Sequence, residues 1–488
     1  MAVVTIASAL ERALGFIYRV YLSRALGAEG VGIYQISVSV IGLLMTITSS
    51  GIPITVSRIM TKHTARRERE LNYKTFTAGV ILSLIASIPI VVILMLFSDF
   101  FSFIFTDKRC MTVLTIMLPG VIITSVYAVV RGYFWGEKKF FTYSVIELLE
   151  EAVMLIAGII SINSAVNSFD GAKRAGLAVL ISYVFSFATA TIIYFARGGK
   201  LKSPKGELKP LISSAAPITL MRTGGSLINT LIAVILPARL LLYGLSGQEA
   251  MSDYGVLSGM VIPLIYIPST LIGSIALVLV PELADNFYRN NHVTLKNNVE
   301  KAIKVSVFIS VLIIPSFLSL GKSIGRMVYG NAAAGIYLRA GAPIMFPMSI
   351  SLISTSMLNS LNLEKKTMLS FFAGAIPLVL CVYFLTPKIG VYSLIAGLML
   401  SYTVTASINS VLIKKTCKVK PRYLDFIIAS FVFLIPSTLF GYLLNNVLGA
   451  FMPYALSTII CSIAVTAFCY AFFKVFNLID LKSLFKKD

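Results

Sequence analysis

Apolar residues recur along this chain in runs of about 20, separated by short polar breaks. A helix of about 20 apolar residues crosses the ~30 Å hydrocarbon core of a bilayer. The runs are continuously apolar, which favours membrane-spanning helices over strands that alternate apolar and polar positions. The pattern therefore predicts an all-α polytopic membrane protein with about fourteen transmembrane helices. Their approximate limits are residues 2–25, 30–60, 74–97, 111–135, 141–163, 173–196, 209–243, 253–280, 299–320, 335–360, 366–386, 389–413, 423–445 and 450–474.

Composition narrows the class of protein further. Of the 488 residues, 57% are hydrophobic and 13% are charged, and the mean hydropathy is +0.87. Soluble domains carry about 25% charged residues, so a soluble enzyme and a disordered chain are excluded. The chain lacks a CxxC pair, has two histidines in polar connectors, and contains neither a GxxxxGK[ST] motif nor a nucleophile–base constellation. We therefore expect a transporter rather than an enzyme, with no metal and no cofactor.

Basic residues in the connectors predict the orientation in the membrane. The formal net charge is +21, which in a soluble chain would suggest nucleic acid as a partner. About 27 of the Lys and Arg residues lie in one set of alternate connectors and about eight in the other. This bias predicts a multi-pass protein of a bacterial cell membrane with both termini in the cytoplasm and no nucleic-acid partner. We expect it to act as a monomer.

A polar connector at 197–209 predicts the division into domains. It is rich in Lys and is broken by Gly198, Gly199, Pro204 and Gly206. It would join two six-helix lobes that each begin in the cytoplasm, giving a parallel repeat. The expected domains are an N-terminal lobe at 1–200, a C-terminal lobe at 201–415, and two further helices with a basic cytoplasmic tail at 416–488.

Charged residues inside the spans predict the site. An ionised side chain at mid-bilayer costs about 2.5–3.5 kcal/mol, so it usually faces a protein interior or a watery cavity. All the embedded cations are Arg and none is Lys, and the planar guanidinium matches pairs of phosphate oxygens. A phosphate or carboxylate cavity would use such a set. These cations are Arg12, Arg19, Arg58, Arg131, Arg222, Arg239 and Arg339.

Depth and spacing select four of these arginines as candidates for a substrate-binding cavity. Arg12 lies near the midplane of span one, and Arg19 shares its helical face. Arg222 lies at similar depth in span seven, and Arg58 lies near the cytoplasmic end of span two. Arg58 could instead be an anchor that snorkels to the interface. The other three embedded arginines are expected to be structural.

Acidic residues offer a competing interpretation. Glu147, Glu150 and Glu151 stand at i, i+3 and i+4 on one face of span five. The first interpretation is that they pair with Arg131 or Lys138, and Arg12 could pair with one of them or with Glu11. The alternative is a proton- or sodium-sensing carboxylate cluster, so these four glutamates are candidates for ion coupling.

Several motifs resemble one family of transporters. These are RALGFIYR at 12–19, LGAEGVGIYQ at 26–35, GIPITVSR at 51–58, PEL at 281–283 and TPKIGVY at 386–392. Together they resemble the polysaccharide-transport flippases related to the stage V sporulation protein B group. That group lies in the multidrug/oligosaccharidyl-lipid/polysaccharide (MOP) exporter superfamily, with the lipid II flippases as relatives. The likeness extends over essentially the whole chain.

The resemblance implies two MATE-like six-helix lobes around a cationic cavity that moves a lipid-linked sugar diphosphate between leaflets. The partners would be membrane lipids and a lipid-linked glycan with an anionic (di)phosphate head group. Lipid II flippases place essential arginines in spans one, two and eight, and Arg12, Arg19 and Arg58 match the first two. Span eight here has no Arg, and spans eleven and twelve lack the acidic residues of a sodium site.

Three functions follow as hypotheses. The first is alternating-access translocation of a lipid-linked oligosaccharide or peptidoglycan precursor from the inner to the outer leaflet. The second is a multidrug or cation antiporter of the same superfamily, which would need a net acidic cavity. The third is a scaffold for envelope or sporulation assembly that transports nothing and needs no cavity arginines.

Overall fold

The computed structural model describes residues 2–289, 291–418 and 424–476, and every regular element in these ranges is a helix. Within the described residues, twelve stretches are long and apolar enough to span a membrane. One of them, Ile6–Ala65, contains the break at Gly27, where φ is 68°. Helix α6 (Phe140–Ile162) is not among the twelve and carries three glutamates. The expected all-α polytopic class is confirmed, whereas the count of fourteen stays a prediction.

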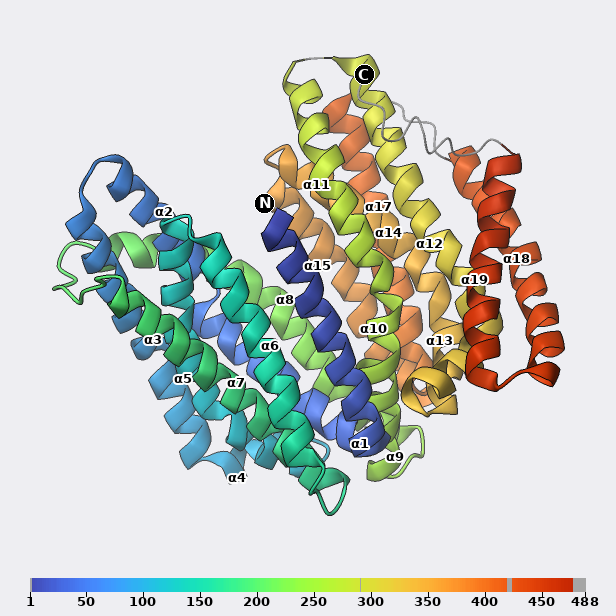
Figure 1. Cartoon of the computed structure of the whole chain (residues 1–488), viewed down its shortest axis with the longest axis horizontal. Helices are drawn as coiled ribbons and strands as arrows, with labels where there is room; N and C mark the ends of the chain where they lie inside the picture. Colours follow the sequence, from blue (N-terminus) through green and yellow to red (C-terminus); the bar gives the residue numbers. More distant parts are fainter. Residues whose placement is uncertain (1, 290, 419–423, 477–488) are drawn as a thin grey trace. The chain divides into compact units, whose positions relative to one another are not determined.

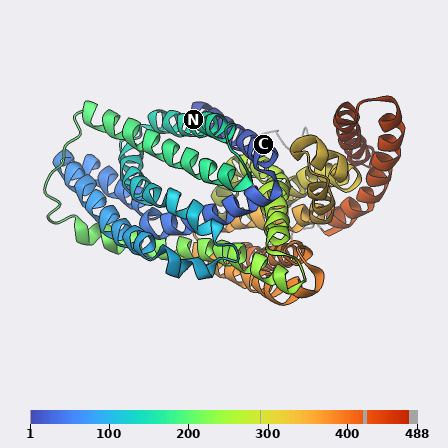
Figure 2. The same cartoon turned by 90° about the horizontal axis from the view of Figure 1, so that it is seen from below.

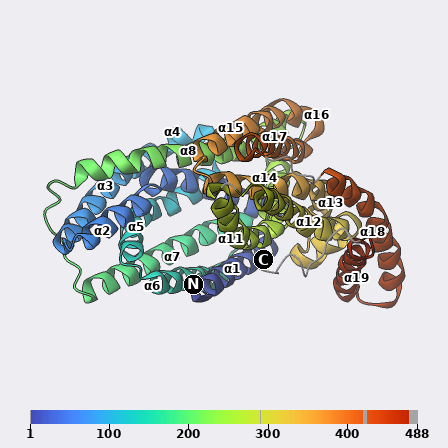
Figure 3. The same cartoon turned by 90° about the horizontal axis from the view of Figure 1, so that it is seen from above.

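Residues 1–255 form the first of two compact units. Its helices, which can be followed in Figure 1, lie roughly alongside one another in Figures 2 and 3. They are α1 (Ala2–Ser49), α2 (Ile52–Ala65), α3 (Arg69–Leu96), α4 (Ser98–Phe101), η1 (Ser102–Ile104), α5 (Arg109–Gly136), α6, α7 (Ser168–Ala196), α8 (Leu208–Leu242) and α9 (Gly247–Tyr254).

Helix α5 is the centre of the first unit. It packs against α1, α2, α3 and α7, and α6 in turn packs along α7 and α1. At one end of the unit, Phe76 stacks on Tyr194 with ring centroids 4.0 Å apart, and both are buried with Phe134. This aromatic core joins α3, α5 and α7, and so fixes the scaffold on which the candidate residues of α1 and α6 stand.

Residues 256–488 form the second unit. Helix α12 packs against α11, α13, α14, α18 and α19, and Figure 1 shows α18 beside α19. The elements are η2 (Gly255–Val261), which starts at the last residue of the first unit, α10 (Ile262–Ile265), α11 (Ile267–Tyr288), α12 (His292–Tyr329), α13 (Ala332–Gly341), η3 (Ala342–Ile344), α14 (Met345–Ser360), α15 (Glu364–Leu380), η4 (Cys381–Leu385), α16 (Thr386–Ile389), α17 (Tyr392–Cys417), α18 (Leu424–Phe451) and α19 (Tyr454–Val475).

Proline acts differently in the two long spans that carry it. Between α1 and α2 the helix is interrupted at Ser50 and Gly51, and Pro53 stands at the start of α2. Proline fits there because the first amides of a helix have no intrahelical acceptor. Pro217 and Pro237, by contrast, lie inside the continuous 35-residue helix α8. The helix is therefore interrupted just before Pro53 but continues through Pro217 and Pro237.

Helix α8 belongs to the compact unit of residues 1–255 and packs against α1, α2 and α3. The division expected from the sequence placed its residues in the second lobe, after the connector at 197–209. The three domains at 1–200, 201–415 and 416–488 remain a hypothesis about functional lobes.

Candidate functional site

The arginines on the first half of α1 have exposed side chains. Arg12 and Arg19 lie on residues 2–26, before the break at Gly27, and both are exposed. Tyr18, beside Arg19 in sequence, is buried with a relative exposure of 2%. The helix therefore turns its arginines out of the first unit while it packs Tyr18 into it.

Arg58 and Arg222 are exposed as well, from α2 and α8. Among the residues that the structure describes, neither of them, nor Arg19, enters an ion pair within 4.0 Å. All the candidate cavity arginines thus lie in the first unit and are exposed residues.

Two of the remaining embedded arginines, Arg131 and Arg339, have partners inside their own units. Arg131 Nη1 lies 3.8 Å from Glu147 Oε1, and its guanidinium lies over the Trp135 ring, 5.4 Å from the centroid. Arg339 donates to the Ser319 carbonyl at 3.5 Å and lies over the ring of Tyr442. Arg239 lies in the last turn of α8 and is partly buried. Cation–π contacts of this kind stabilise a guanidinium that has left water.

The acidic face of α6 points into the first unit. Glu147 pairs with Arg131 and is also hydrogen-bonded by the Tyr143 hydroxyl. Glu151 faces α1: a methyl group on Gly15 would lie 3.7 Å from Glu151 Oε2. Glu151 also interacts electrostatically with Glu11 and Arg19 of α1. The structure thus brings together the four glutamates singled out by sequence, on two neighbouring helices.

Buried tyrosines surround these carboxylates, and sequence reasoning did not find them. The hydroxyl groups of Tyr18 and Tyr127 are buried, and within the described residues neither has a hydrogen-bond partner. Both interact electrostatically with the acidic face, Tyr18 with Glu151 and Tyr127 with Glu150 and Glu147. The spacing of Tyr127 four residues before Arg131 was an available signal, because both then lie on one face of α5. In the described part of the chain, no group of three His, Cys, Asp or Glu side chains could hold a metal ion.

A second polar junction lies where α8 crosses the gap between α1 and α2. Arg222 Nη1 donates to the Ser50 carbonyl at 3.3 Å, and the Gly51 amide donates to Thr219 Oγ1 at 3.1 Å. A Cβ at position 51 would lie 2.4 Å from the Ala215 carbonyl oxygen, so only glycine permits this close approach. Arg222 and Thr219 thus satisfy backbone groups that the helix break leaves without intrahelical partners.

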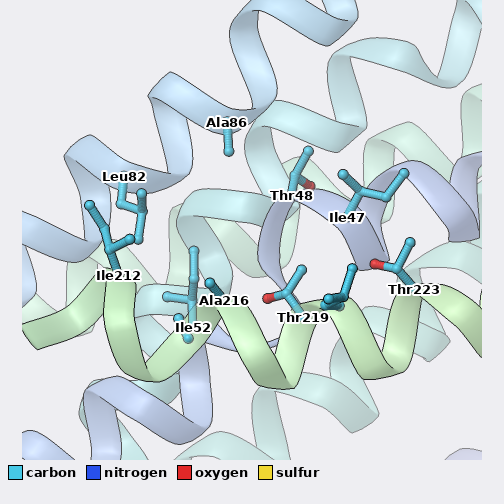
Figure 4. A pocket seen from close by; sticks show the side chains of 11 residues that line it. Ile47, Thr48, Ile52, Leu82, Ala86, Ile212, Ala216, Thr219 and Thr223 are labelled. Carbon is cyan, nitrogen blue, oxygen red and sulfur yellow. The ribbon is translucent and has the colours of Figure 1, made fainter.

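A cavity of about 410 Å³ opens beside this junction (Figure 4). Leu82 of α3 and Ile212 of α8 point towards each other across it. The side chains of Thr219 and Thr223 project from the face of α8 that is turned towards Thr48. The lining is mostly aliphatic, and no sequence motif indicated it.

One family model matches more than half of the chain. The model is described as "Polysaccharide biosynthesis protein" and covers residues 1–287. Two relatives come from Bacillus subtilis (strain 168). Stage V sporulation protein B is 22% identical over 441 residues, which cover 86% of this chain and 85% of that protein. Lipid II flippase MurJ is 22% identical over 410 residues, covering 77% and 74%.

Solved structures give the same fold. Lipid II flippase MurJ in an inward closed conformation superposes with a TM-score of 0.72 at 15% identity and covers 98% of this chain and 100% of that one. A multidrug resistance MATE family transporter of the MOP superfamily, in an inward-facing conformation, gives 0.66 at 14% identity and covers 84% and 96%. The predicted resemblance to MOP-superfamily transporters is confirmed at the level of the fold.

Proposed function

Because this chain belongs to the polysaccharide biosynthesis protein family and has the fold of the MOP-superfamily transporters, we propose that it is a flippase for a lipid-linked glycan. The substrate would be an oligosaccharide or peptidoglycan precursor on a polyprenyl diphosphate, moved from the inner to the outer leaflet by alternating access. The related lipid II flippase MurJ and the description of the family model as a polysaccharide biosynthesis protein support this class of substrate.

The observation that carries the proposal is the exposure of Arg12, Arg19, Arg58 and Arg222 on membrane-spanning helices. A guanidinium left in contact with hydrocarbon would cost about 2.5–3.5 kcal/mol. The cost falls when the group faces a watery cavity and an anion. A diphosphate offers paired oxygens that match the fork of each guanidinium, so an anionic head group is the ligand that this set fits best.

The test is complementation of a bacterial strain depleted of its lipid II flippase. The full chain should restore growth and expose lipid-linked precursor at the outer leaflet, where an added hydrolase or glycan-binding probe reaches it. The control is the same vector expressing the chain with all four arginines replaced by Gln, at equal membrane abundance. If the wild type accumulates in the membrane but no polyprenyl-linked precursor reaches the outer leaflet, the proposal is wrong.

A second function is favoured by one observation, the carboxylate face of α6. Glu147 forms an ion pair with Arg131 and interacts electrostatically with Glu11, Glu150 and Glu151. Two buried tyrosine hydroxyl groups nearby, those of Tyr18 and Tyr127, have no hydrogen-bond partner among the described residues. This arrangement would suit a proton- or cation-coupled antiporter. The face would then bind and release the coupling ion as the helices move.

Energetic coupling separates the two functions. An outward-moving anionic head group is favoured by a cytoplasm-negative potential, at about 2.3 kcal/mol per charge and 100 mV. Collapsing only the potential should therefore stop an arginine-centred flippase. An antiporter should respond chiefly to the proton or sodium gradient and should fail when Glu150 is replaced by Gln. Precursor exposure that persists without potential but is lost in Glu150→Gln would favour the acidic mechanism.

A further inference from the structure

The cavity between α1, α2, α3 and α8 has the character of a site for a hydrocarbon chain. Its volume of about 410 Å³ lies near the lower end of the roughly 300–1,000 Å³ that ligand sites occupy. Leu82, Ile212 and Ile47 contribute apolar surface, and the polar groups among the lining residues are the hydroxyls of Thr48, Thr219 and Thr223. Each of these helices belongs to a stretch long and apolar enough to span the membrane.

An arginine stands at the rim of this cavity. Arg222 lies between Thr219 and Thr223 on α8, both of which line the cavity, and it donates to the carbonyl of Ser50. Ser50 lies in sequence between Thr48 and Ile52, which both line the cavity. The bond to Ser50 uses one of the five N–H donors of the guanidinium. Because the side chain is exposed, the remaining donors can meet an anionic group at the same edge.

An aliphatic cavity beside a guanidinium group fits a ligand that has a hydrocarbon chain next to an anionic group. A glycerophospholipid carries two chains beside its phosphate, whereas a polyprenyl diphosphate carries a single chain attached directly to its phosphates. A cavity of this volume holds a segment of one chain. The adjoining Arg222 then complements the charge of the head group where that chain begins.

We propose that this cavity binds the head-proximal segment of a single prenyl chain, with Arg222 contacting the diphosphate to which the chain is attached. The inference rests on the proposed function and adds to it a place for the lipid part of the substrate. It makes the junction of α1, α2 and α8 part of the binding site rather than only a helix contact.

Filling the cavity tests the inference. Ala86 and Ala216 line it, and Phe at either position would occupy the space that a chain needs. Matched controls lie on the same helices: Ile85 is 65% exposed beside Ala86, and Ser213 is exposed on α8. The purified full chain and its Ala86→Phe, Ala216→Phe, Ile85→Phe, Ser213→Phe and Arg222→Ala variants are titrated with undecaprenyl diphosphate, uncharged undecaprenol and phosphatidylglycerol. Binding is followed by native mass spectrometry, and melting temperatures verify that each variant is folded.

The expected result is a loss of about tenfold or more in undecaprenyl diphosphate affinity in both cavity variants, with the two controls within about twofold of the wild type. Arg222→Ala should weaken binding of the diphosphate but leave binding of undecaprenol unchanged. Wild-type affinity in Ala86→Phe and Ala216→Phe, or equal competition by phosphatidylglycerol, would overturn this inference and leave the proposed function standing. No binding of undecaprenyl diphosphate by the wild type would overturn both.

Discussion

Single residues on α1 decide where charge is available to a substrate. Arg12 and Arg19 are exposed, whereas Tyr18 and the carboxylate of Glu151 are turned towards the interior of the first unit. On this helix the buried Tyr18 contributes to packing, whereas the exposed Arg12 and Arg19 are available to bind a substrate. Substitution of the arginines should therefore change transport more than folding.

We expect Arg12→Ala and Arg19→Ala each to lower transport by about ten- to a hundredfold at normal membrane abundance. A hydrogen bond to a charged group contributes about 1.5–3 kcal/mol, and 1.4 kcal/mol corresponds to tenfold. Lys should restore only part of the activity, because its point charge lacks the planar fork. Arg66→Ala, an exposed arginine of the connector after α2, is the control. Outer-leaflet precursor accessibility is the measurement, and full transport by Arg12→Ala would contradict the role.

The ion pair of Arg131 with Glu147 should behave differently, as a contribution to folding. Both side chains are largely buried, with 29% and 24% of their side-chain surface exposed, and Arg131 Nη1 lies 3.8 Å from the carboxylate. Removing one partner leaves the other charge buried and uncompensated. We expect Arg131→Met and Glu147→Gln each to lower the melting temperature of the purified protein.

The double variant Arg131→Met/Glu147→Gln completes the cycle. It should be less destabilised than the sum of the two single variants, by about 0.5–3 kcal/mol, because the pair acts as a unit. Additive effects would mean that the two side chains do not interact in the folded protein.

At the scale of elements, backbone contact between helices replaces side-chain packing at the crossing of α1 with α9. A Cβ on Gly32 would lie 2.0 Å from the Met251 carbonyl oxygen, and one on Gly255 would lie 2.1 Å from that of Ala28. The neighbour in each case is backbone, which cannot rotate away as a side chain can. The crossing therefore depends on glycine from both segments.

We expect Gly32→Ala to lower the melting temperature by several degrees, since forcing extra volume into a packed contact costs about 1–3 kcal/mol. Gly42→Ala is the matched control on the same helix, because a Cβ there meets nothing within 4 Å. Alanine favours a helix over glycine by about 1 kcal/mol, so this control should be neutral or stabilising. Equal melting temperatures for the two variants would show that α1 and α9 are not in contact as described.

For the whole molecule, the alternation of basic and less basic connectors predicts which loops face the cytoplasm. All five cysteines are buried, so labelling with a membrane-impermeant maleimide starts from a low background. Single cysteines can then be added at exposed positions in successive connectors. Val166 and Gly247 lie in connectors expected outside, and Ala65 and Ser203 in connectors expected inside.

Val166→Cys and Gly247→Cys should react in intact cells, whereas Ala65→Cys and Ser203→Cys should react only after the membrane is permeabilised. The physical reason is the retention of Lys- and Arg-rich connectors on the cytoplasmic side during insertion. Reaction of Ser203→Cys from outside would contradict the predicted orientation. It would also contradict the inner-to-outer direction of the proposed transport.

The class of fold and the approximate spans could be predicted from the sequence because they depend on local quantities. A hydrophobic run must match the thickness of the bilayer, and a backbone in hydrocarbon must satisfy its hydrogen bonds within a helix. The break before Pro53 could also be predicted from local sequence, because proline has no amide hydrogen with which to continue the hydrogen bonds of a helix. The set of embedded arginines was also visible, because charge within an apolar run is rare wherever it occurs.

The site itself depends on which residues face one another, and only the tertiary structure decided that. Helical spacing put Glu147, Glu150 and Glu151 on one face, but the crossing of α6 with α1 and α5 brought that face to Gly15 and Arg131. Likewise, the long separation in sequence between Ser50 and Arg222 concealed their hydrogen bond and the adjoining cavity. Periodicity relates residues three or four apart on one helix, whereas a cavity depends on how separate helices cross and on the small side chains at those crossings.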